Sequence, residues 1–510
     1  MLYDSNAAHR ELDRCFGYPG FRPGQEELIC AVVEGRDALG ILPTGGGKSV
    51  CYQIPALLFP GLTLVVSPLI SLMEDQVNRA NGAGASAAFL NSTQPASEAR
   101  EAISRAEAGE LRLLFIAPER FEVPAFRSRL PKLGVSLLAV DEAHCISEWG
   151  HDFRPSYLRL GRVRESLSCP VLALTATATP RVREEICSQL RLADPLVTLK
   201  SFDRPNLSWE VSRATGHGGK LRRLRALVRG RSGSLLVYAP TRRTVEVLRD
   251  QLASLGLPVE AYHAGLTGEE RARVQEEFMA GRRRIVVATN AFGMGVDKSD
   301  VRLVVHYQLS GTLEGYYQEA GRAGRDGDPA KCVALYDPRD SRTHFRMLDG
   351  NHPPIRLQRR AYRALRTEIG AGGSEPLPLP RMRALLGSRV SEPELLSLLR
   401  SLEREGCIRL LTPLAEAHEL DEPCVNRGGG GEGCGIRGEH LRKECEVTVG
   451  VYSREPDFRR CRRLREIAVE KLRAVRRYAL ARGCRRRVLL AYFGEQIPDR
   501  PCGGCDHCRG

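Results

Sequence analysis

Short apolar runs alternate with amphipathic stretches along much of this chain, and this alternation limits its fold more than any other feature. Between residues 35 and 200 five runs read as strands: DALGIL, LTLVVS, LRLLFIA, LLAVDE and PVLALTAT. The pattern restarts after residue 220 with GSLLVYA, VEAYHA, RRIVVAT, VRLVVHY and KCVALYD. Strands that are separated by helical stretches form parallel sheets covered on both faces. The sequence therefore predicts two similar α/β lobes in tandem, joined near 203–219.

The pattern changes near residue 340, where three helical segments and a strand-like CIRLL occupy 354–411. One segment, SEPELLSLLRSLEREG, has a capping box of Ser391 and Glu394. Its apolar stripe consists of Leu395, Leu398, Leu399 and Leu402. These features fit a winged-helix module, and they fit a generic helical insert almost as well. The expected divisions are lobes at 1–202 and 203–345, an insert at 353–415, a glycine-rich linker at 416–445 and a C-terminal helical module at 446–510.

The stretch ILPTGGGKS at 41–49 follows a predicted strand and precedes an apolar, helix-like run. Glycines let backbone N–H groups approach phosphate oxygens, and a helix N-terminus adds positive potential. Lys48 can reach the β- and γ-phosphates, and the Ser49 hydroxyl can ligate Mg²⁺. The strict phosphate-loop pattern has glycine where this chain has Leu42, so a chance glycine-rich turn is the alternative. The strand–loop–helix context favours a nucleotide site that comprises Thr44, Gly45, Gly46, Gly47, Lys48 and Ser49.

Two carboxylates, Asp141 and Glu142, end the predicted strand about ninety residues beyond Lys48. An aspartate in this position can hold Mg²⁺, and the adjacent glutamate can orient or deprotonate an attacking water. Isolated Asp-Glu pairs usually lie on solvated surfaces. The position of this pair on a later strand of the same predicted sheet favours a catalytic role.

Phosphoryl transfer also needs positive charge at the γ-phosphate as the bond breaks. The stretch YYQEAGRAGRDG at 316–327 supplies Arg322 and Arg325 from the second lobe. If these arginines reach the γ-phosphate from the second lobe, ATP hydrolysis would require the two lobes to close, and the reaction would be coupled to lobe movement. The alternative is two surface arginines on a helix.

Aromatic and charged side chains follow the carboxylates closely, at Trp149, His151, Phe153 and Arg154. The aromatic faces can stack on bases at about 1–3 kcal/mol per base, without sequence preference. His151 and Arg154 can contact a nucleic-acid backbone. Because this loop leaves the strand of Asp141 and Glu142 directly, a stacked base could shift the catalytic carboxylates. The alternative is that the aromatics are ordinary core residues.

Four C-terminal cysteines have the spacing C-x17-C-x2-C-x2-C, at Cys484, Cys502, Cys505 and Cys508. Four thiolates suit tetrahedral Zn²⁺ and close its coordination shell, which predicts a structural site. His507 is a lower-ranked substitute ligand. The other cysteines have irregular spacing and read as plain thiols.

The net charge of +14 is concentrated in an arginine-rich stretch at 459–487. This stretch is either a solvated helix face or a phosphate-binding surface for nucleic acid. The longest apolar run, LTLVVSPLISLM, is too short to span a bilayer, and the first residues lack the plan of a signal peptide. We therefore expect a cytoplasmic protein that contacts no membrane.

In chain order these motifs resemble those of the RecQ family of DNA helicases, DExH-type motors of superfamily 2. FGYPGFRPGQEELI at 16–29 resembles the family's adenine-reading motif, which implicates Phe21, Arg22 and Gln25. DEAHCISEWGHDFRPSY is similar to the family's metal-binding segment and aromatic-rich loop, and LTATAT at 174–179 resembles the motif that links hydrolysis to movement. YHAGL, VVATNAFGMGVDKSDVRLVVHY and YQEAGRAGRDG also match. The resemblance covers about 10–340 and returns at 459–508.

The resemblance implies two RecA-like lobes, a zinc-binding module, and ATP, Mg²⁺ and Zn²⁺ as cofactors. It implies 3′→5′ translocation on single-stranded DNA, unwinding of branched DNA in recombination and repair, and an aromatic-rich loop that senses the strand. The chain departs from the usual family order, in which a winged helix follows the zinc module. Here the insert precedes it, and the sequence ends just after Cys508.

Two alternative functions remain open. An RNA helicase would share the motor motifs, although the aromatic loop and cysteine module argue against it. A nucleic-acid-binding scaffold with an inactive ATPase is opposed by Lys48, Asp141, Glu142, Arg322 and Arg325. Protein partners and the preferred DNA structure are left open, and a monomer is the working expectation.

Overall fold

The computed structural model describes residues 3–43, 45–68, 70–91, 94–293, 296, 298–387, 390–410, 446–451 and 458–509. They form two compact units. One contains residues 1–337 together with 475–510, and the other contains 338–474. The predicted glycine-rich linker at 416–445 lies outside the described residues.

The N-terminal half of the first unit is a seven-stranded sheet in the order β3-β4-β2-β5-β6-β1-β7, with every pairing parallel. The strands are β1 (Ala38–Ile41), β2 (Leu62–Val66), β3 (Ala87–Leu90), β4 (Leu113–Ile116), β5 (Val135–Val140), β6 (Val171–Thr175) and β7 (Leu196–Leu199). The helices are α1 (Ser5–Phe16), α2 (Gln25–Val33), α3 (Val50–Leu58), α4 (Ile70–Gly82), α5 (Ala96–Glu107), α6 (Pro124–Arg127), α7 (Leu160–Glu165) and α8 (Pro180–Gln189).

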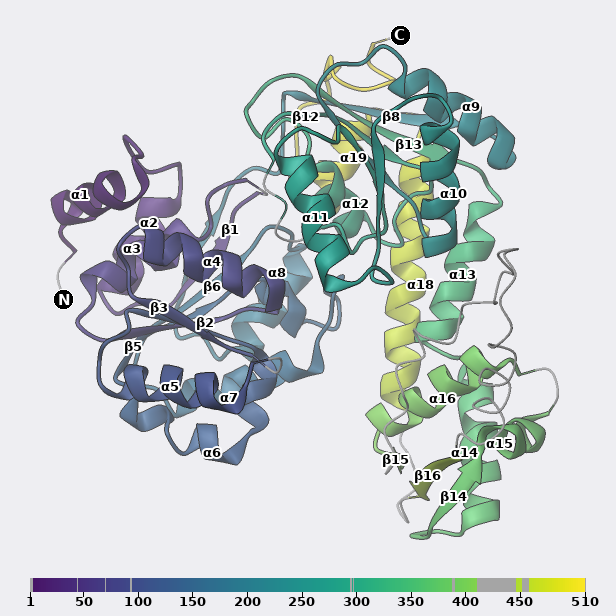
Figure 1. The fold of residues 1–510 in the computed structure, drawn as a ribbon, viewed down its shortest axis with the longest axis horizontal. Helices are drawn as coiled ribbons and strands as arrows, with labels where there is room; N and C mark the ends of the chain where they lie inside the picture. The colour runs from purple at the N-terminus through teal and green to yellow at the C-terminus, as the bar shows by residue number, and fades with distance from the viewer. Residues whose placement is uncertain are drawn as a thin grey trace, which may run out of the picture. The chain divides into compact units, whose positions relative to one another are not determined.

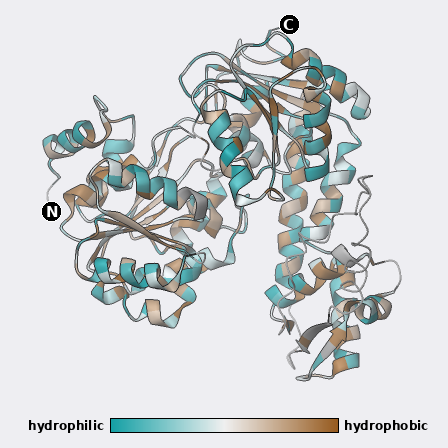
Figure 2. Cartoon of the chain, viewed as in Figure 1, coloured by the Kyte–Doolittle hydropathy of each residue, from teal (hydrophilic) through white to brown (hydrophobic). Residues whose placement is uncertain are grey.

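Helices cover both faces of this sheet, with α3 and α4 on one face and α5 and α7 on the other (Figure 1). Strands β1, β2, β4 and β6 are buried along their whole length, as expected for a sheet covered on both sides. The apolar strands therefore lie inside and the polar helix faces outside (Figure 2). This arrangement confirms the α/β lobe predicted from the alternating runs.

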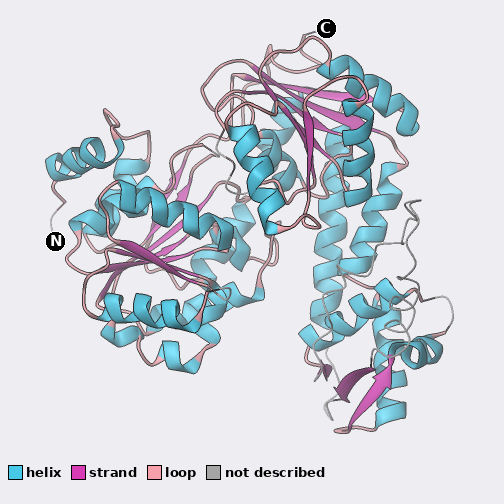
Figure 3. Cartoon of the chain, in the orientation of Figure 1, coloured by secondary structure: helices cyan, strands magenta, loops and turns pink. Residues whose placement is uncertain are grey.

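The second lobe repeats the design with a six-stranded parallel sheet in the order β10-β11-β9-β12-β13-β8 (Figure 3). Its strands are β8 (Leu207–Arg213), β9 (Ser234–Tyr238), β10 (Val259–Tyr262), β11 (Ile285–Ala288), β12 (Val301–His306) and β13 (Ala330–Tyr336). Its helices are α9 (Gly216–Val228), α10 (Arg242–Ala253), α11 (Gly268–Met279) and α12 (Leu313–Ala320).

One edge strand lies where the sequence predicted only a connection between the lobes. Strand β8 pairs with β13 over seven residues, from Leu207 to Arg213. Its side chains alternate between buried and half-buried, with Leu207, Trp209 and Val211 facing inward. The segment at 203–219 is therefore not a plain linker, because its period-two pattern adds a strand to the sheet.

The second unit carries the predicted insert. Its elements are α13 (Asp340–Asn351), α14 (Ile355–Ile369), β14 (Ser374–Pro378), α15 (Leu379–Leu386), α16 (Glu392–Arg404), β15 (Ile408–Leu410) and β16 (Glu446–Val451). Strand β16 pairs antiparallel with both β14 and β15. From α14 onward the described elements follow the order helix, strand, two helices and two strands, which is that of a winged helix and favours this reading of the insert over a generic helical one.

Local features of the insert agree with the sequence. The capping box of Ser391 and Glu394 is present at the start of α16. The stripe of Leu395, Leu398, Leu399 and Leu402 is buried in the unit's core. Strand β16 had been assigned to the C-terminal module, but its pairing places it in the sheet of the insert. The long helix α18 (Arg459–Leu480) contributes residues to both compact units.

Candidate active site

The glycine-rich loop lies between β1 and α3, at the carboxyl edge of the first sheet. Gly45 and Gly47 have φ of +81° and +71°, the left-handed region that glycine adopts without strain. A Cβ on Gly46 would lie 2.8 Å from the Pro43 carbonyl oxygen, and one on Gly47 would lie 2.6 Å from Gln25 Nε2. The loop thus requires glycines, as a backbone cradle for phosphates does. Thr44 lies outside the described residues.

The residues of the predicted adenine-reading motif brace this loop. Gln25 Nε2 donates to the carbonyl oxygens of Gly46 at 3.0 Å and Gly47 at 2.9 Å. The Arg22 guanidinium donates to the carbonyl oxygen of Gly45, and the Phe21 ring packs edge-on against His9. This segment and the phosphate loop therefore form one structural element, with Lys48 and Ser49 half-buried at the start of α3.

Asp141 and Glu142 follow β5, which is separated from β1 by β6 alone. Because these strands are parallel, their carboxyl ends lie at the same sheet edge as the phosphate loop. The Tyr157 hydroxyl donates to the Asp141 carbonyl oxygen at 3.1 Å. Glu142 has φ +47°, a conformation that costs a non-glycine residue roughly 1–2 kcal/mol. Such local strain concentrates at functional sites.

The pKa values of the two carboxylates shift in opposite directions. Burial, and then the charge of Glu142, raises the pKa of Asp141. Burial alone would raise the pKa of Glu142, but Lys48 and His144 outweigh it and lower that pKa. A cation beside the pair would stabilise its doubly ionised form, so the oxygen donors of Asp141 and Ser49 fit Mg²⁺.

A chain of side chains joins Glu142 to the aromatic loop. His144 Nδ1 lies 3.3 Å from a Glu142 carboxylate oxygen and 2.9 Å from Thr175 Oγ1, in the LTATAT motif. The buried His144 ring stacks on His151, with ring centres 4.2 Å apart. His151 Nε2 lies 3.1 Å from Gln318 Oε1 of α12, in the second lobe. This path brings the catalytic edge, the aromatic loop and the second lobe into contact.

The aromatic loop is packed but is not part of the fully buried core. Trp149, His151, Phe153 and Arg154 are all half-buried. Arg154 hydrogen-bonds the Pro68 carbonyl oxygen at 2.6 Å and pairs with Asp152 at 3.1 Å, so its charge takes part in the local fold. Three further residues of this site had no role in the sequence-based expectations: His144, Gln318 and Arg181, whose guanidinium lies over the Trp149 ring. His144, two residues after Glu142, and Gln318, inside YYQEAGRAGRDG, lie in motifs that could have indicated them.

Arg322 and Arg325 lie in the segment between α12 and β13, which we call the arginine loop (residues 321–329). Arg322 is 5% exposed, and both guanidinium groups donate to the Val296 carbonyl oxygen, at 3.4 and 3.0 Å. A Cβ on Gly45 would lie 3.7 Å from Arg325 Cγ. The Arg325 side chain therefore lies against the phosphate loop of the first lobe.

The four predicted cysteines come together. The sulfur atoms of Cys484, Cys502, Cys505 and Cys508 all lie within 4.8 Å of one another. Tetrahedral Zn–S bonds of about 2.3 Å need sulfurs about 3.8 Å apart, so the cluster fits Zn²⁺. Burial raises the pKa of Cys505, but hydrogen bonds from the Arg485 backbone and from nearby thiols lower it to about 7. His507 contacts the Ala481 carbonyl oxygen at 3.0 Å instead.

Two arginines of the predicted basic surface have structural partners. Helix α19 (Arg485–Tyr492) begins directly after Cys484. Arg485 and Arg486 are 5% and 7% exposed and pair with Asp506 and Asp203, each at 3.1 Å. Neither alternative left open for the arginine-rich stretch, a solvated face or a phosphate-binding surface, fits these two residues, because burial removes both charges from solvent. Arg487 is more exposed and pairs with Asp499.

Two α/β lobes, with a phosphate loop and acidic pair on the first and an arginine loop on the second, define a helicase-type motor. Three family models match accordingly: DEAD/DEAH box helicase at 22–186, helicase conserved C-terminal domain at 219–327 and RecQ zinc-binding at 455–509. Among curated proteins, the probable ATP-dependent DNA helicase RecS of Bacillus subtilis is 34% identical over 500 residues, which are 97% of this chain and 90% of that protein. The chain belongs to the RecQ family.

A second curated relative matches this chain over only part of its own length. The ATP-dependent DNA helicase RecQ of Pasteurella multocida is 46% identical over 330 residues, 64% of this chain. This match spans about half of that protein, 52%.

Solved structures support the fold. The helicase MrfA bound to DNA gives a TM-score of 0.55 at 16% identity, over 80% of this chain and 61% of its own. The Mycobacterium smegmatis helicase Lhr bound to ssDNA and AMP-PNP gives a TM-score of 0.53 at 22% identity, over 78% of this chain and 55% of its own. Within the described residues, no helix is both long and apolar enough to cross a membrane.

Proposed function

We propose that this chain is an ATP-dependent DNA helicase that couples hydrolysis to movement along single-stranded DNA and to duplex unwinding. The observation that carries the proposal is the position of Arg325 against Gly45 of the phosphate loop, within one compact unit. The aliphatic part of Arg325, from the second lobe, thereby lies against the phosphate loop of the first, and its guanidinium is proposed to turn to the γ-phosphate when nucleotide binds. Hydrolysis then depends on how the lobes close, which is what a motor requires.

The residues of the site divide the work of phosphoryl transfer. The backbone of Thr44, Gly45, Gly46 and Gly47 cradles the phosphates, and Lys48 neutralises the β/γ oxygens. Ser49 and Asp141 hold Mg²⁺, which when bound withdraws charge from the phosphates. Glu142 is proposed to orient or deprotonate the attacking water through its ionised carboxylate. Arg322 and Arg325 stabilise charge on the γ-phosphate, and Phe21, Arg22 and Gln25 form the adenine side.

The aromatic loop is proposed to report DNA to this site. Trp149 and Phe153 would stack on bases, and the path His151–His144–Glu142 would carry the change to the carboxylates. His151 is also a candidate backbone contact. Arg154 would have to leave Asp152 and Pro68 to bind a phosphate, so we assign it first to the shape of the loop.

Zinc and the insert have separate proposed roles. The four-cysteine cluster would hold one structural Zn²⁺ that stabilises the C-terminal module. The winged-helix order of the insert suits contact with duplex DNA. Family membership supports 3′→5′ polarity, branched DNA as substrate, and work in recombination and repair. We further propose that the protein acts as a monomer in the cytoplasm.

The test is strand displacement with the full chain, ATP and Mg²⁺, on duplexes with a 3′ or a 5′ single-stranded overhang. We expect unwinding of the 3′-overhang DNA, none of the 5′-overhang DNA, and none by Glu142→Gln. The matched control is Glu98→Gln, at an exposed carboxylate on α5. Equal unwinding of an all-RNA duplex would favour an RNA helicase, and ATP-independent DNA binding alone would favour a scaffold.

A further inference from the structure

The arginine loop has no regular secondary structure, yet it carries both arginines that the reaction needs. Such a segment holds its side chains in place only if its backbone is fixed by other groups. A displacement of about 1 Å in a catalytic group can cost about 10²-fold in rate. The contacts that hold residues 321–329 therefore bear directly on catalysis.

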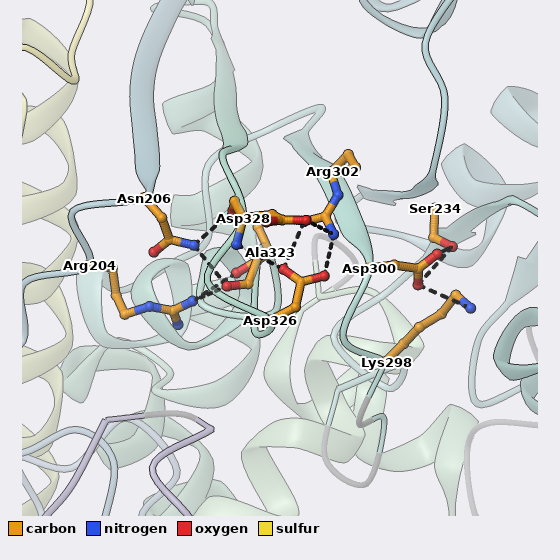
Figure 4. A network of polar contacts seen from close by, with 10 residues as sticks. Arg204, Asn206, Ser234, Lys298, Asp300, Arg302, Ala323, Asp326 and Asp328 are labelled. Atoms are coloured by element: carbon orange, nitrogen blue, oxygen red, sulfur yellow. Dashed lines mark hydrogen bonds and ion pairs between the residues drawn. The ribbon is translucent and has the colours of Figure 1, made fainter. Parts of the chain in front are cut away.

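Two residues just before β8 hold four backbone carbonyls of this loop (Figure 4). The Arg204 guanidinium donates to three carbonyl oxygens of the loop, those of Gly321 at 3.3 Å, Ala323 at 3.1 Å and Gly324 at 2.7 Å. Asn206 Nδ2 donates to Gly324 at 2.8 Å and to Asp328 at 2.9 Å. The carbonyls on both sides of Arg322, and the one that precedes Arg325, are thereby fixed.

Gly324 shows how closely this anchor fits. Its φ is +55°, and a Cβ there would lie 2.5 Å from Asn206 Nδ2 and 2.7 Å from the Asp328 carbonyl oxygen. Its N–H donates to the Val301 carbonyl oxygen at 2.9 Å, at the start of β12. The backbone between the two arginines therefore packs directly on Asn206, with no room for a side chain.

The far end of the loop is held from β12 (Figure 4). The Arg302 guanidinium pairs with both carboxylate oxygens of Asp326 and lies 3.4 Å from Asp328. Hydrogen bonds from Arg302 lower the pKa of Asp326, so the pair stays ionised. Nearby, Asp300 accepts from Ser234 at 3.2 Å and pairs with Lys298 at 3.1 Å, which fixes the start of the same strand.

The anchoring segment is in turn held by the cysteine module. Arg486 donates to the carbonyl oxygens of Pro205 at 3.2 Å and Leu207 at 2.8 Å, and it pairs with Asp203 at 3.1 Å. Trp209 N–H donates to the Gly504 carbonyl oxygen at 2.9 Å, next to Cys505. A continuous set of contacts thus runs from the cysteines through Arg486 and residues 203–207 to the arginine loop.

We propose that Arg204 and Asn206 are positioning residues for Arg322 and Arg325, and that the cysteine module sets their place through Arg486. This inference rests on the proposed function, since it presumes that the two arginines act in ATP hydrolysis. The cysteine module then supports the rate of hydrolysis as well as the stability of its own fold.

The experiment measures ATP turnover at saturating single-stranded DNA for Arg204→Ala, Asn206→Ala and Arg486→Ala in the full chain. We expect kcat to fall by about 10- to 100-fold while the KM for ATP and the affinity for a fluorescein-labelled strand stay within about twofold. Arg204→Lys should recover little, because an ammonium group cannot bridge three carbonyls. The controls are Arg213→Ala, exposed at the end of β8, and Arg487→Ala on α19, both expected to keep wild-type kcat.

A double variant separates a positioning role from a merely structural one. If Arg204 acts through the arginine loop, Arg204→Ala should cost little more in an Arg325→Ala chain than Arg325→Ala costs alone. Asn206→Ser offers a milder change if Arg204→Ala does not fold. If Arg325→Ala lowers kcat while Arg204→Ala and Asn206→Ser do not, the inference is overturned and the proposed function stands. If Arg325→Ala has wild-type kcat, the proposed role of Arg325 in hydrolysis is rejected, and the positioning inference that rests on it is rejected with it.

Discussion

The guanidinium carbon of Arg181, in the first turn of α8, lies 3.7 Å from the centre of the Trp149 indole ring. The same guanidinium pairs with Glu185, which accepts a hydrogen bond from Ser147 at 2.6 Å. Trp149 Nε1 is buried and has no hydrogen-bond partner among the described residues. One face of the indole is therefore covered by a cation, and a base must use the other face or displace Arg181.

Loss of the stacking faces should uncouple DNA from ATP without preventing the binding of either. Trp149→Ala and Phe153→Ala should each weaken binding of single-stranded DNA by at most about 1–3 kcal/mol. DNA stimulation of ATP turnover should fall much further, because the path through His151 and His144 loses its input. Turnover with and without DNA, beside DNA affinity, measures both effects.

The control for that experiment is Phe345→Ala, at an aromatic residue on α13 that is 46% exposed. It should leave DNA stimulation unchanged. Full stimulation in both Trp149→Ala and Phe153→Ala would mean that these aromatics serve only to pack the loop.

Replacing a cysteine of the cluster should release zinc and destabilise the C-terminal module. Cys502→Ser removes one of four ligands, and metal binding and folding are linked in small zinc sites. Metal analysis should find about one zinc per wild-type chain and a reduced content in the variant, with a lower Tm. Cys187→Ser, at a half-buried thiol outside the cluster, should change neither. Zinc-free protein from a gentle purification would contradict the four-cysteine site.

Arg485 should matter for stability rather than for DNA affinity. Its side chain is 6% exposed and pairs with Asp506, so Arg485→Ala would leave a half-buried carboxylate with backbone donors but without its cation, at a cost of about 1–3 kcal/mol in the free energy of unfolding. Arg487→Ala, one residue on, should cost less than about 0.5 kcal/mol, because its partner Asp499 is 90% exposed. Urea denaturation compares the two. If the Arg485→Ala and Arg487→Ala variants have equal free energies of unfolding, the Arg485–Asp506 pair contributes no more to stability than a solvent-exposed pair.

The exposed arginines of α14 are the best candidates for phosphate contacts in the insert. Arg356 and Arg363 lie on one exposed face of this helix, without an acidic residue between them. If they bind duplex DNA, the joint change to alanine should reduce the slope of log affinity against log salt by about 2, near 0.9 per contact. Arg409→Ala, exposed on β15, is the matched control. An unchanged slope would place these arginines outside the DNA contact.

Much of the fold could be read from the sequence, because parallel strands buried on both faces leave continuous apolar runs. Strand β8 was missed, since its Leu207–Trp209–Val211 alternation is short and follows a proline. The winged-helix reading stayed ambiguous because β16 lies far along the chain from β14, with which it pairs.

The residues of the candidate site were recognisable where they form contiguous motifs, and were missed where they act through distant partners. Gln318 is 167 residues from His151, and Arg204 is 120 residues from Gly324. No local sequence pattern predicts a contact between residues so far apart in the chain. The burial of Arg485 and Arg486 was not foreseen for a related reason, since a run of arginines does not reveal which of them a fold will bury.

The most direct test of the account is phosphate release from ATP by the full chain, with and without saturating single-stranded DNA, for wild type, Lys48→Ala and Glu142→Gln. We predict that DNA stimulates the wild-type rate at least about tenfold and that both variants stay at background while retaining DNA binding. Lys132→Ala, at an exposed lysine, should behave as wild type. A wild-type rate that ignores DNA, or near-normal turnover in Glu142→Gln, would contradict the assignment of this chain as a DNA-driven motor.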